Sequence, residues 1–163
     1  MDEKDIVSQP IAIIAKEVGF STEGRHQWAY DLSVESEKKL LKFEDDGWNL
    51  KHPDVVYAPT REELHRWLRE EHKLYVHHYT LYAETGEVFW GVDVYDITKG
   101  HNKLADDYSL FSSEALFRAT SNKAALLNTY EDAYTVGLAQ ACIIVKLRKD
   151  GQEAQQKITK PAK

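Results

Sequence analysis

The segment of residues 57–76 constrains the fold most, because a well-marked helix start there leads into a strand without a breaker. Thr60 and Glu63 have the spacing of a capping box. In that motif the threonine hydroxyl accepts a hydrogen bond from the glutamate N–H, and the glutamate carboxylate accepts one from the threonine N–H. Three apolar residues then recur at helical spacing: Leu64, Trp67 and Leu68. The pattern predicts an amphipathic helix over residues 61–72 that runs directly into a β-strand.

That strand opens a predicted β-hairpin over residues 74–97, whose two halves are rich in β-branched and aromatic residues. If Thr85 and Gly86 are the central residues of a two-residue turn, His78 lies opposite Asp93. The face expected to pack on helices then holds the pairs Leu81 with Trp90, Tyr79 with Val92 and His77 with Val94. A register shifted by one residue would exchange the two faces.

Two further helices are marked by their ends. Gly19 supplies a left-handed stop after residues 9–18, and Thr129 caps residues 130–147, whose apolar stripe holds small residues. We therefore predict an α+β fold with a small antiparallel sheet built on the 74–97 hairpin. Helices near 9–18, 61–72 and 130–147 pack on it. Residues 1–147 are predicted to form a single domain, and residues 148–163 a polar, disordered tail.

The segments between these elements are less clearly marked. Residues 21–57 read as irregular with short strands. A polar connection follows the hairpin, and residues 112–118 could form a short helix.

Charge is unevenly distributed along the chain. The formal net charge is −6, and residues 146–163 hold six Lys and Arg against two Asp and Glu, or +4. Residues 1–145 therefore carry −10. An acidic surface repels phosphate, so the body of the protein is not expected to bind nucleic acid. The basic end can touch an anionic partner, but such ends are more commonly just solvated.

Composition bounds the class further. Hydrophobic residues make up 42% of the 163, enough for a buried core, and the single Cys rules out an internal disulfide. No secretory signal opens the sequence, and its apolar runs are far shorter than the ~20 residues of a membrane span. We expect a soluble, cytoplasmic protein without a membrane partner or a cofactor.

Histidines on and just after the predicted 61–72 helix are the most suggestive chemical feature. His72, His78 and Asp93 could together hold a divalent metal ion such as zinc, or His78 and Asp93 could act as an acid–base pair. Adjacent strand residues such as His77 and His78 point to opposite faces, however. The spacing therefore argues against a metal site. For His78 and Asp93, which have no nucleophile beside them, an ordinary cross-strand polar pair is the favoured interpretation. Cys142, on an apolar helical stripe, is expected to be a small buried hydrophobe.

Aromatic side chains give a second candidate site. Tyr75, Tyr82, Phe89 and Tyr95 lie off the hairpin face assigned to the core, and an exposed face of this kind would bind a protein partner or a second copy. The alternative is that residues 21–57 or 104–127 cover it.

Two motifs carry a family resemblance. Residues 58–72, with Ala58-Pro59-Thr60 leading to Trp67-Leu68-Arg69-Glu70 and His72, make up the first. The second is Thr129-Tyr130-Glu131-Asp132-Ala133 with Gly137-Leu138. Together they resemble uncharacterised small proteins encoded by phages and integrated mobile elements of gut bacteria. The resemblance implies a setting in the host cell but assigns no activity or functional residue.

The leading hypothesis is an accessory protein of a phage or mobile element that binds another macromolecule, most simply a protein, without enzymatic activity. The alternatives are a small metal-dependent or His/Asp-based enzyme, and a virion component.

Overall fold

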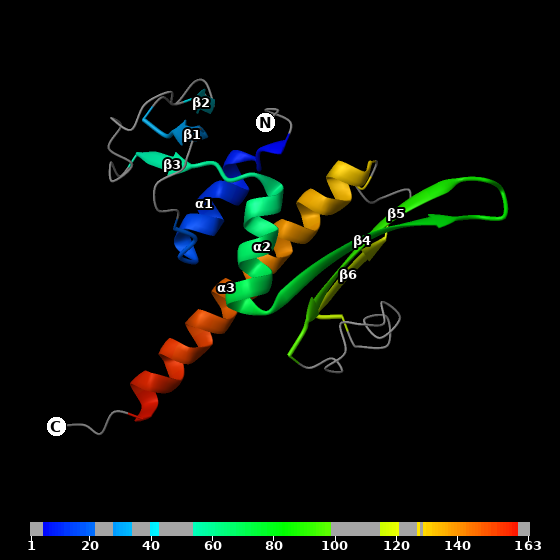
Figure 1. The fold of residues 1–163 in the computed structure, drawn as a ribbon. Coiled ribbons are helices and arrows are strands. Elements are labelled where there is room, and N and C mark those ends of the chain that lie inside the picture. Colours follow the sequence, from blue (N-terminus) through cyan, green and yellow to red (C-terminus); the bar gives the residue numbers. More distant parts are fainter. Residues whose placement is uncertain are drawn as a thin grey trace. The chain divides into compact units, whose positions relative to one another are not determined.

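Helices and antiparallel sheets alternate along the chain, which confirms the predicted α+β class (Figure 1). The computed structural model describes residues 5–21, 28–33, 40–42, 54–98, 115–120, 127 and 129–159. The helices are α1 (Gln9–Glu17), α2 (Arg61–His72) and α3 (Tyr130–Thr159). The strands are β1 (Trp28–Asp31), β2 (Leu40–Lys42), β3 (Val55–Tyr57), β4 (Leu74–Tyr82), β5 (Val88–Asp96) and β6 (Phe117–Thr120).

Helix α2 begins where the capping box predicts. The Thr60 N–H donates to Glu63 Oε2 at 2.9 Å, and the Glu63 N–H donates to Thr60 Oγ1 at 3.1 Å. Two backbone donors at the helix start are thereby satisfied. Leu64 and Leu68 are fully buried, as their spacing predicts, whereas Trp67 is only partly buried.

Helix α1 ends at the predicted glycine. Gly19 has a φ of +92°, which a side chain with a Cβ rarely adopts. The Phe20 N–H donates to the Ala15 carbonyl at 2.8 Å, and the Gly19 N–H donates to the Lys16 carbonyl at 3.0 Å. These two bonds form a Schellman motif, which pairs carbonyls that the helix end would otherwise leave open.

Helix α3 starts at its predicted cap but extends past its predicted end. Thr129 and Asp132 exchange backbone-to-side-chain hydrogen bonds of 3.1 Å each. The helix then continues to Thr159, so the prediction that it ends at 147 is wrong. Residues 148–159 are helical rather than a disordered tail, and residues 160–163 lie outside the described part of the chain. The Lys149 side chain anchors the start of this extension by a hydrogen bond to the Val18 carbonyl, a long-range contact that the local sequence does not reveal.

The chain divides into two compact units, which are described separately. The first comprises Met1–Leu64 and Cys142–Lys163, and the second His65–Ala141. This division does not test the predicted single domain over 1–147, because neither unit is shown to fold alone. That domain stays a prediction.

The first unit contains a sheet in the order β2-β1-β3, with β1 antiparallel to both neighbours. Tyr30 donates a hydrogen bond to the Val7 carbonyl at 2.8 Å. On α3, Lys146 pairs with Glu17 of α1 at 2.7 Å, and Lys149 donates to the Val18 carbonyl. These bonds tie α3 to the end of α1 at residues 146 and 149, on either side of the predicted helix end.

The second unit contains a sheet in the order β4-β5-β6, packed against the first half of α3. Gly137 of α3 lies directly on the sheet. A Cβ added there would lie 2.5 Å from both Val76 Cγ1 and Val92 Cγ2. The missing side chain at Gly137, one of the small residues of the predicted stripe, therefore allows helix and sheet to approach closely. Residues 117 and 118, expected to end a short helix, instead belong to strand β6.

The hairpin register differs from the predicted one by a single residue. Ala83 is paired with Glu87, so three residues rather than two form the loop. Gly86, with a φ of +82°, takes the left-handed position that such loops require. The longer loop shifts every pair by one. His77 therefore lies opposite Asp93, and the predicted pair of His78 with Asp93 is wrong.

Candidate functional site

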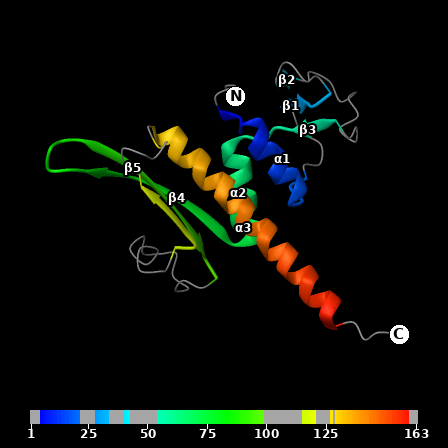
Figure 2. The ribbon, with the colours of Figure 1, turned by 180° about the vertical axis from the view of Figure 1, so that it is seen from behind.

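Among the described residues of the second unit, the most exposed large apolar side chains lie at the turn end of the hairpin. We call residues 80–90 the hairpin arm. Strand β6 pairs only with residues 91–94 of β5, and in Figures 1 and 2 the turn of the hairpin extends well past β6. Leu81, Tyr82 and Val88 are 46%, 76% and 47% exposed. Since side chains alternate along a strand, Leu81 lies on one face, and Tyr82 and Val88 on the other.

The outer edge of β4 is open along the arm. The bonds at Ala83 and Lys73 place the odd-numbered residues of β4 in the hydrogen-bonded pairs with β5. The N–H and C=O groups of His78, Thr80 and Tyr82 therefore point away from β5. Among the described residues, no strand pairs with this edge. An open edge with exposed apolar side chains is the usual target of strand addition by another chain.

The base of the hairpin is closed by a histidine. His65 of α2 accepts a hydrogen bond from the Val76 N–H at Nε2, 3.3 Å away. Its Nδ1 lies 2.9 Å from the Tyr134 hydroxyl of α3. Because Nε2 must be unprotonated to accept, the neutral ring carries its proton on Nδ1 and donates it to Tyr134. His65 thus joins α2, β4 and α3. It also accepts a hydrogen bond from the outward-pointing N–H of Val76, the donor next to the open edge.

Burial keeps this histidine neutral. Desolvation, followed by the nearby charges of Arg69 and His78, lowers the pKa of His65 to about 4. Burial and then His77 lower the pKa of His78 as well. The His78 ring packs edge-on against Tyr130 at 4.5 Å. Both imidazoles are therefore part of the packing between the sheet and α3.

The opposite face of the sheet holds a buried carboxylate. Asp93 is 3% exposed and receives hydrogen bonds from Tyr95 at 2.8 Å and from Tyr79 at 3.3 Å. Arg118 of β6 donates to it from Nε at 3.1 Å and from Nη2 at 3.0 Å. Burial, then the bond to Asp93, raises the pKa of the Tyr95 phenol. The carboxylate is engaged by three partners, an arrangement that joins β5 to β6.

Sequence reasoning missed Tyr79 and Arg118 as partners of this carboxylate. Tyr79 was missed because the predicted register, shifted by one residue, placed it on the face opposite to Asp93. Arg118 lies in a segment whose pattern did not indicate a strand. The Tyr79 ring lies over Gly91, where an added Cβ would come within 2.5 Å of it. A glycine opposite a tyrosine in a strand is the one signal that could have located this face.

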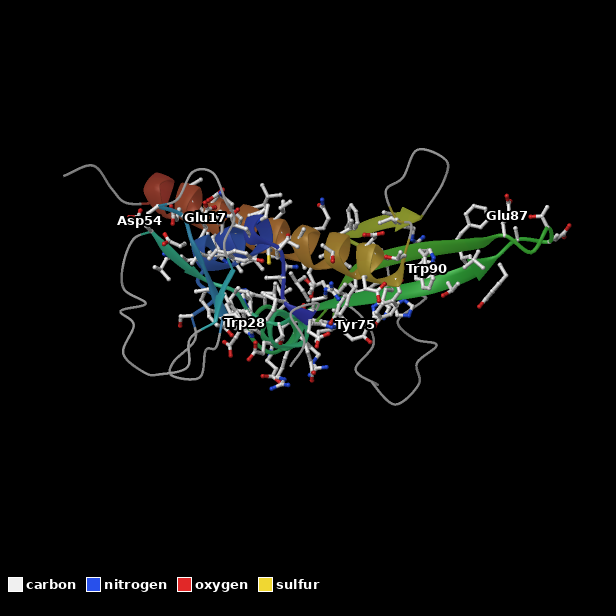
Figure 3. The ribbon with its side chains drawn as sticks, turned by 90° about the horizontal axis from the view of Figure 1, so that it is seen from above. Glu17, Trp28, Asp54, Tyr75, Glu87 and Trp90 are labelled. Atoms are coloured by element: carbon white, nitrogen blue, oxygen red, sulfur yellow. The ribbon has the colours of Figure 1, made fainter. Side chains whose placement is uncertain are left out.

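The predicted aromatic site does not form a single exposed face. Tyr75 and Tyr95 lie opposite each other, with Phe89 on the same face, while Tyr82 is on the other. Tyr95 is 1% exposed, so it is a core residue. In Figure 3, Tyr75, Trp90 and Glu87 follow one another from the base of the hairpin to its turn. Of the predicted set, Tyr82 and Phe89 belong to the hairpin arm, and their binding role stays a prediction.

The predicted metal ligands do not converge. His78 and Asp93 are on opposite faces of the sheet, and the His72 ring at the end of α2 packs 4.4 Å from Trp67. Within the described ranges, no three His, Cys, Asp or Glu side chains are grouped closely enough for a metal ion. Burial raises the pKa of the Cys142 thiol to about 12, in keeping with a small buried hydrophobe.

Comparisons with protein families, curated proteins and solved structures give no match to this chain. None of the helices in the described residues combines the length and apolarity needed to cross a membrane.

Proposed function

We propose that this chain is a binding protein whose hairpin arm contacts another protein. The observation that supports it is the exposure of Leu81, Tyr82 and Val88 on a strand pair with an open edge. Apolar side chains exposed on both faces contribute little to the fold's stability, and they form the kind of surface that interfaces cover. The accessory role in a phage or mobile element, in the host-cell cytoplasm, is the setting we propose for this binding.

A photo-crosslinking experiment tests the proposal. The crosslinking residue p-benzoylphenylalanine replaces Tyr82 or Val88 in the full chain, expressed in cells that carry its native gene. The matched control replaces Leu147, which is 64% exposed on α3. We expect a discrete protein adduct from positions 82 and 88 that position 147 does not give.

Mass spectrometry of the adduct distinguishes a different protein from a second copy of this chain. A triple variant, Leu81→Thr with Tyr82→Thr and Val88→Thr, removes the apolar surface. It should reduce binding of the identified partner at least tenfold while the far-UV circular dichroism is retained. Equal labelling from all three positions, or binding unchanged by the triple variant, would contradict the proposal.

A further inference from the structure

We infer that the open edge of β4 binds an extended, basic segment of the partner as an added strand at His78, Thr80 and Tyr82. The inference rests on the proposed function and specifies how the partner binds. It follows from the direction of the backbone groups, from the point at which the edge becomes available, and from the charges around it.

The backbone groups supply the first argument. The outward N–H and C=O groups of His78, Thr80 and Tyr82 alternate along the edge at the spacing of an antiparallel or parallel ladder. They accommodate a partner segment of about five residues. Toward the base, His65 already occupies the Val76 N–H, so the added strand cannot extend past His78 on that side.

The side chains beside the edge determine what the segment carries. Leu81 on one face and Tyr82 on the other are both exposed, so partner side chains pointing to either face gain apolar contact. A strand of alternating apolar and polar residues can place its apolar side chains on either of these faces and its polar side chains on the other. The contacts resemble those between neighbouring strands within one sheet.

The charged side chains near the edge determine whether the polar residues of the partner segment are basic or acidic. Residues 74–98 contain no Lys or Arg, and the exposed charged side chains of the arm are Glu84 and Glu87. Glu131, also exposed, lies next to Tyr130, whose ring contacts both His78 and Trp90. A segment with Lys or Arg beside its apolar residues is therefore attracted, and an acidic one is repelled.

The probe is the capped hexapeptide Lys-Val-Lys-Val-Lys-Val, added to the full-length, isotope-labelled protein. We expect amide chemical-shift changes centred on His78, Thr80 and Tyr82, and slower hydrogen exchange at the Thr80 N–H. The Glu-Val hexapeptide should bind at least tenfold more weakly. Rising salt should weaken the binding of the Lys-Val peptide.

Thr80→Pro tests the backbone directly. The Thr80 N–H points away from β5, so proline removes the donor for the added strand without breaking the hairpin ladder. Thr80→Val is the matched control, because it changes the side chain and keeps the donor. We expect Thr80→Pro to bind the Lys-Val peptide at least tenfold more weakly than Thr80→Val, with the amide spectrum of Val92 and Val94 preserved in both.

Equal binding by these two variants, or equal binding of the acidic and basic peptides, would overturn the inference. If Thr80→Pro still gives the partner adduct at position 82, the partner uses the faces of the arm, and only the added strand is refuted. If wild type gives no arm adduct at all, the proposed function itself is refuted.

Discussion

The two ends of the β4–β5 hairpin are built from the same kinds of residue but have different surroundings. At the base, Val76 and Val92 are fully buried beneath Gly137 of α3, and His65 occupies the outward N–H of Val76. At the arm, Leu81 and Val88 are about half exposed. One pair of strands therefore serves as core at one end and as surface at the other.

The difference separates residues kept for stability from residues available for binding. Packing against α3 accounts for the apolar side chains at the base. Within the described part of the chain, no such packing covers Leu81, Tyr82 and Val88, which are about half exposed or more. Substitutions at the two ends should therefore change different properties. Substitutions at the base should lower the free energy of unfolding, and substitutions in the arm should weaken association with the partner.

The largest effect is expected where α3 touches the sheet. Gly137→Ala introduces a Cβ within 2.5 Å of Val76 and Val92, so helix or sheet must shift. We expect a loss of about 2–3 kcal/mol in the free energy of unfolding, measured by urea denaturation. The control, Gly151→Ala, lies in the same helix with nothing within 4 Å and should stabilise by up to about 1 kcal/mol. Equal stabilisation by both would mean that α3 does not press on the sheet.

A matched pair of valines on β5 compares the two ends most directly. Val92→Thr places a hydroxyl in the core at a fully buried site and should cost about 1–2 kcal/mol. Val88→Thr makes the same chemical change on the same face of the same strand, where the side chain is 47% exposed. Its cost should stay below about 0.5 kcal/mol. Similar unfolding midpoints for the two variants would remove the distinction between base and arm.

The last expected effect concerns pH and the histidine at the base. The folded pKa of His65, about 4, lies below its ordinary value of 6.5. The unfolded chain therefore takes up the proton first as pH falls. The contribution of neutral His65 to the free energy of unfolding is fully present above pH 6.5 and is lost as pH falls toward 4. For this partly buried ring it amounts to on the order of 1–2 kcal/mol.

His65→Gln keeps an acceptor for the Val76 N–H but does not titrate. We expect urea denaturation between pH 7 and pH 4 to show a shallower loss of stability for this variant than for wild type. Some slope should remain, because the pKa of His78 is lowered too. Parallel profiles for wild type and His65→Gln would show that His65 does not contribute to the pH dependence.

Local signals predicted the starts of α2 and α3, the end of α1 and the presence of the hairpin. The capping pair Thr60 and Glu63, the stop at Gly19 and the cap at Thr129 lie within a few residues of the groups they satisfy, so neighbouring sequence is sufficient to reveal them. The site was predicted less well. A single extra loop residue exchanged the faces of β5 relative to β4, so the predicted aromatic set combined buried Tyr95 with exposed Tyr82.

The sequence by itself determined the class of fold, the start of each helix and the strands of the hairpin, because these depend on contacts within a few residues. The tertiary structure decided the register, the partners of Asp93 and the extension of α3 to Thr159. The register depends on the length of the loop between the two strands. The other two features depend on groups far apart in the chain, such as Arg118 with Asp93 and Lys149 with Val18, whose meeting no local pattern specifies. It also decided which end of the hairpin stays exposed, because α3 and His65 cover only one of them.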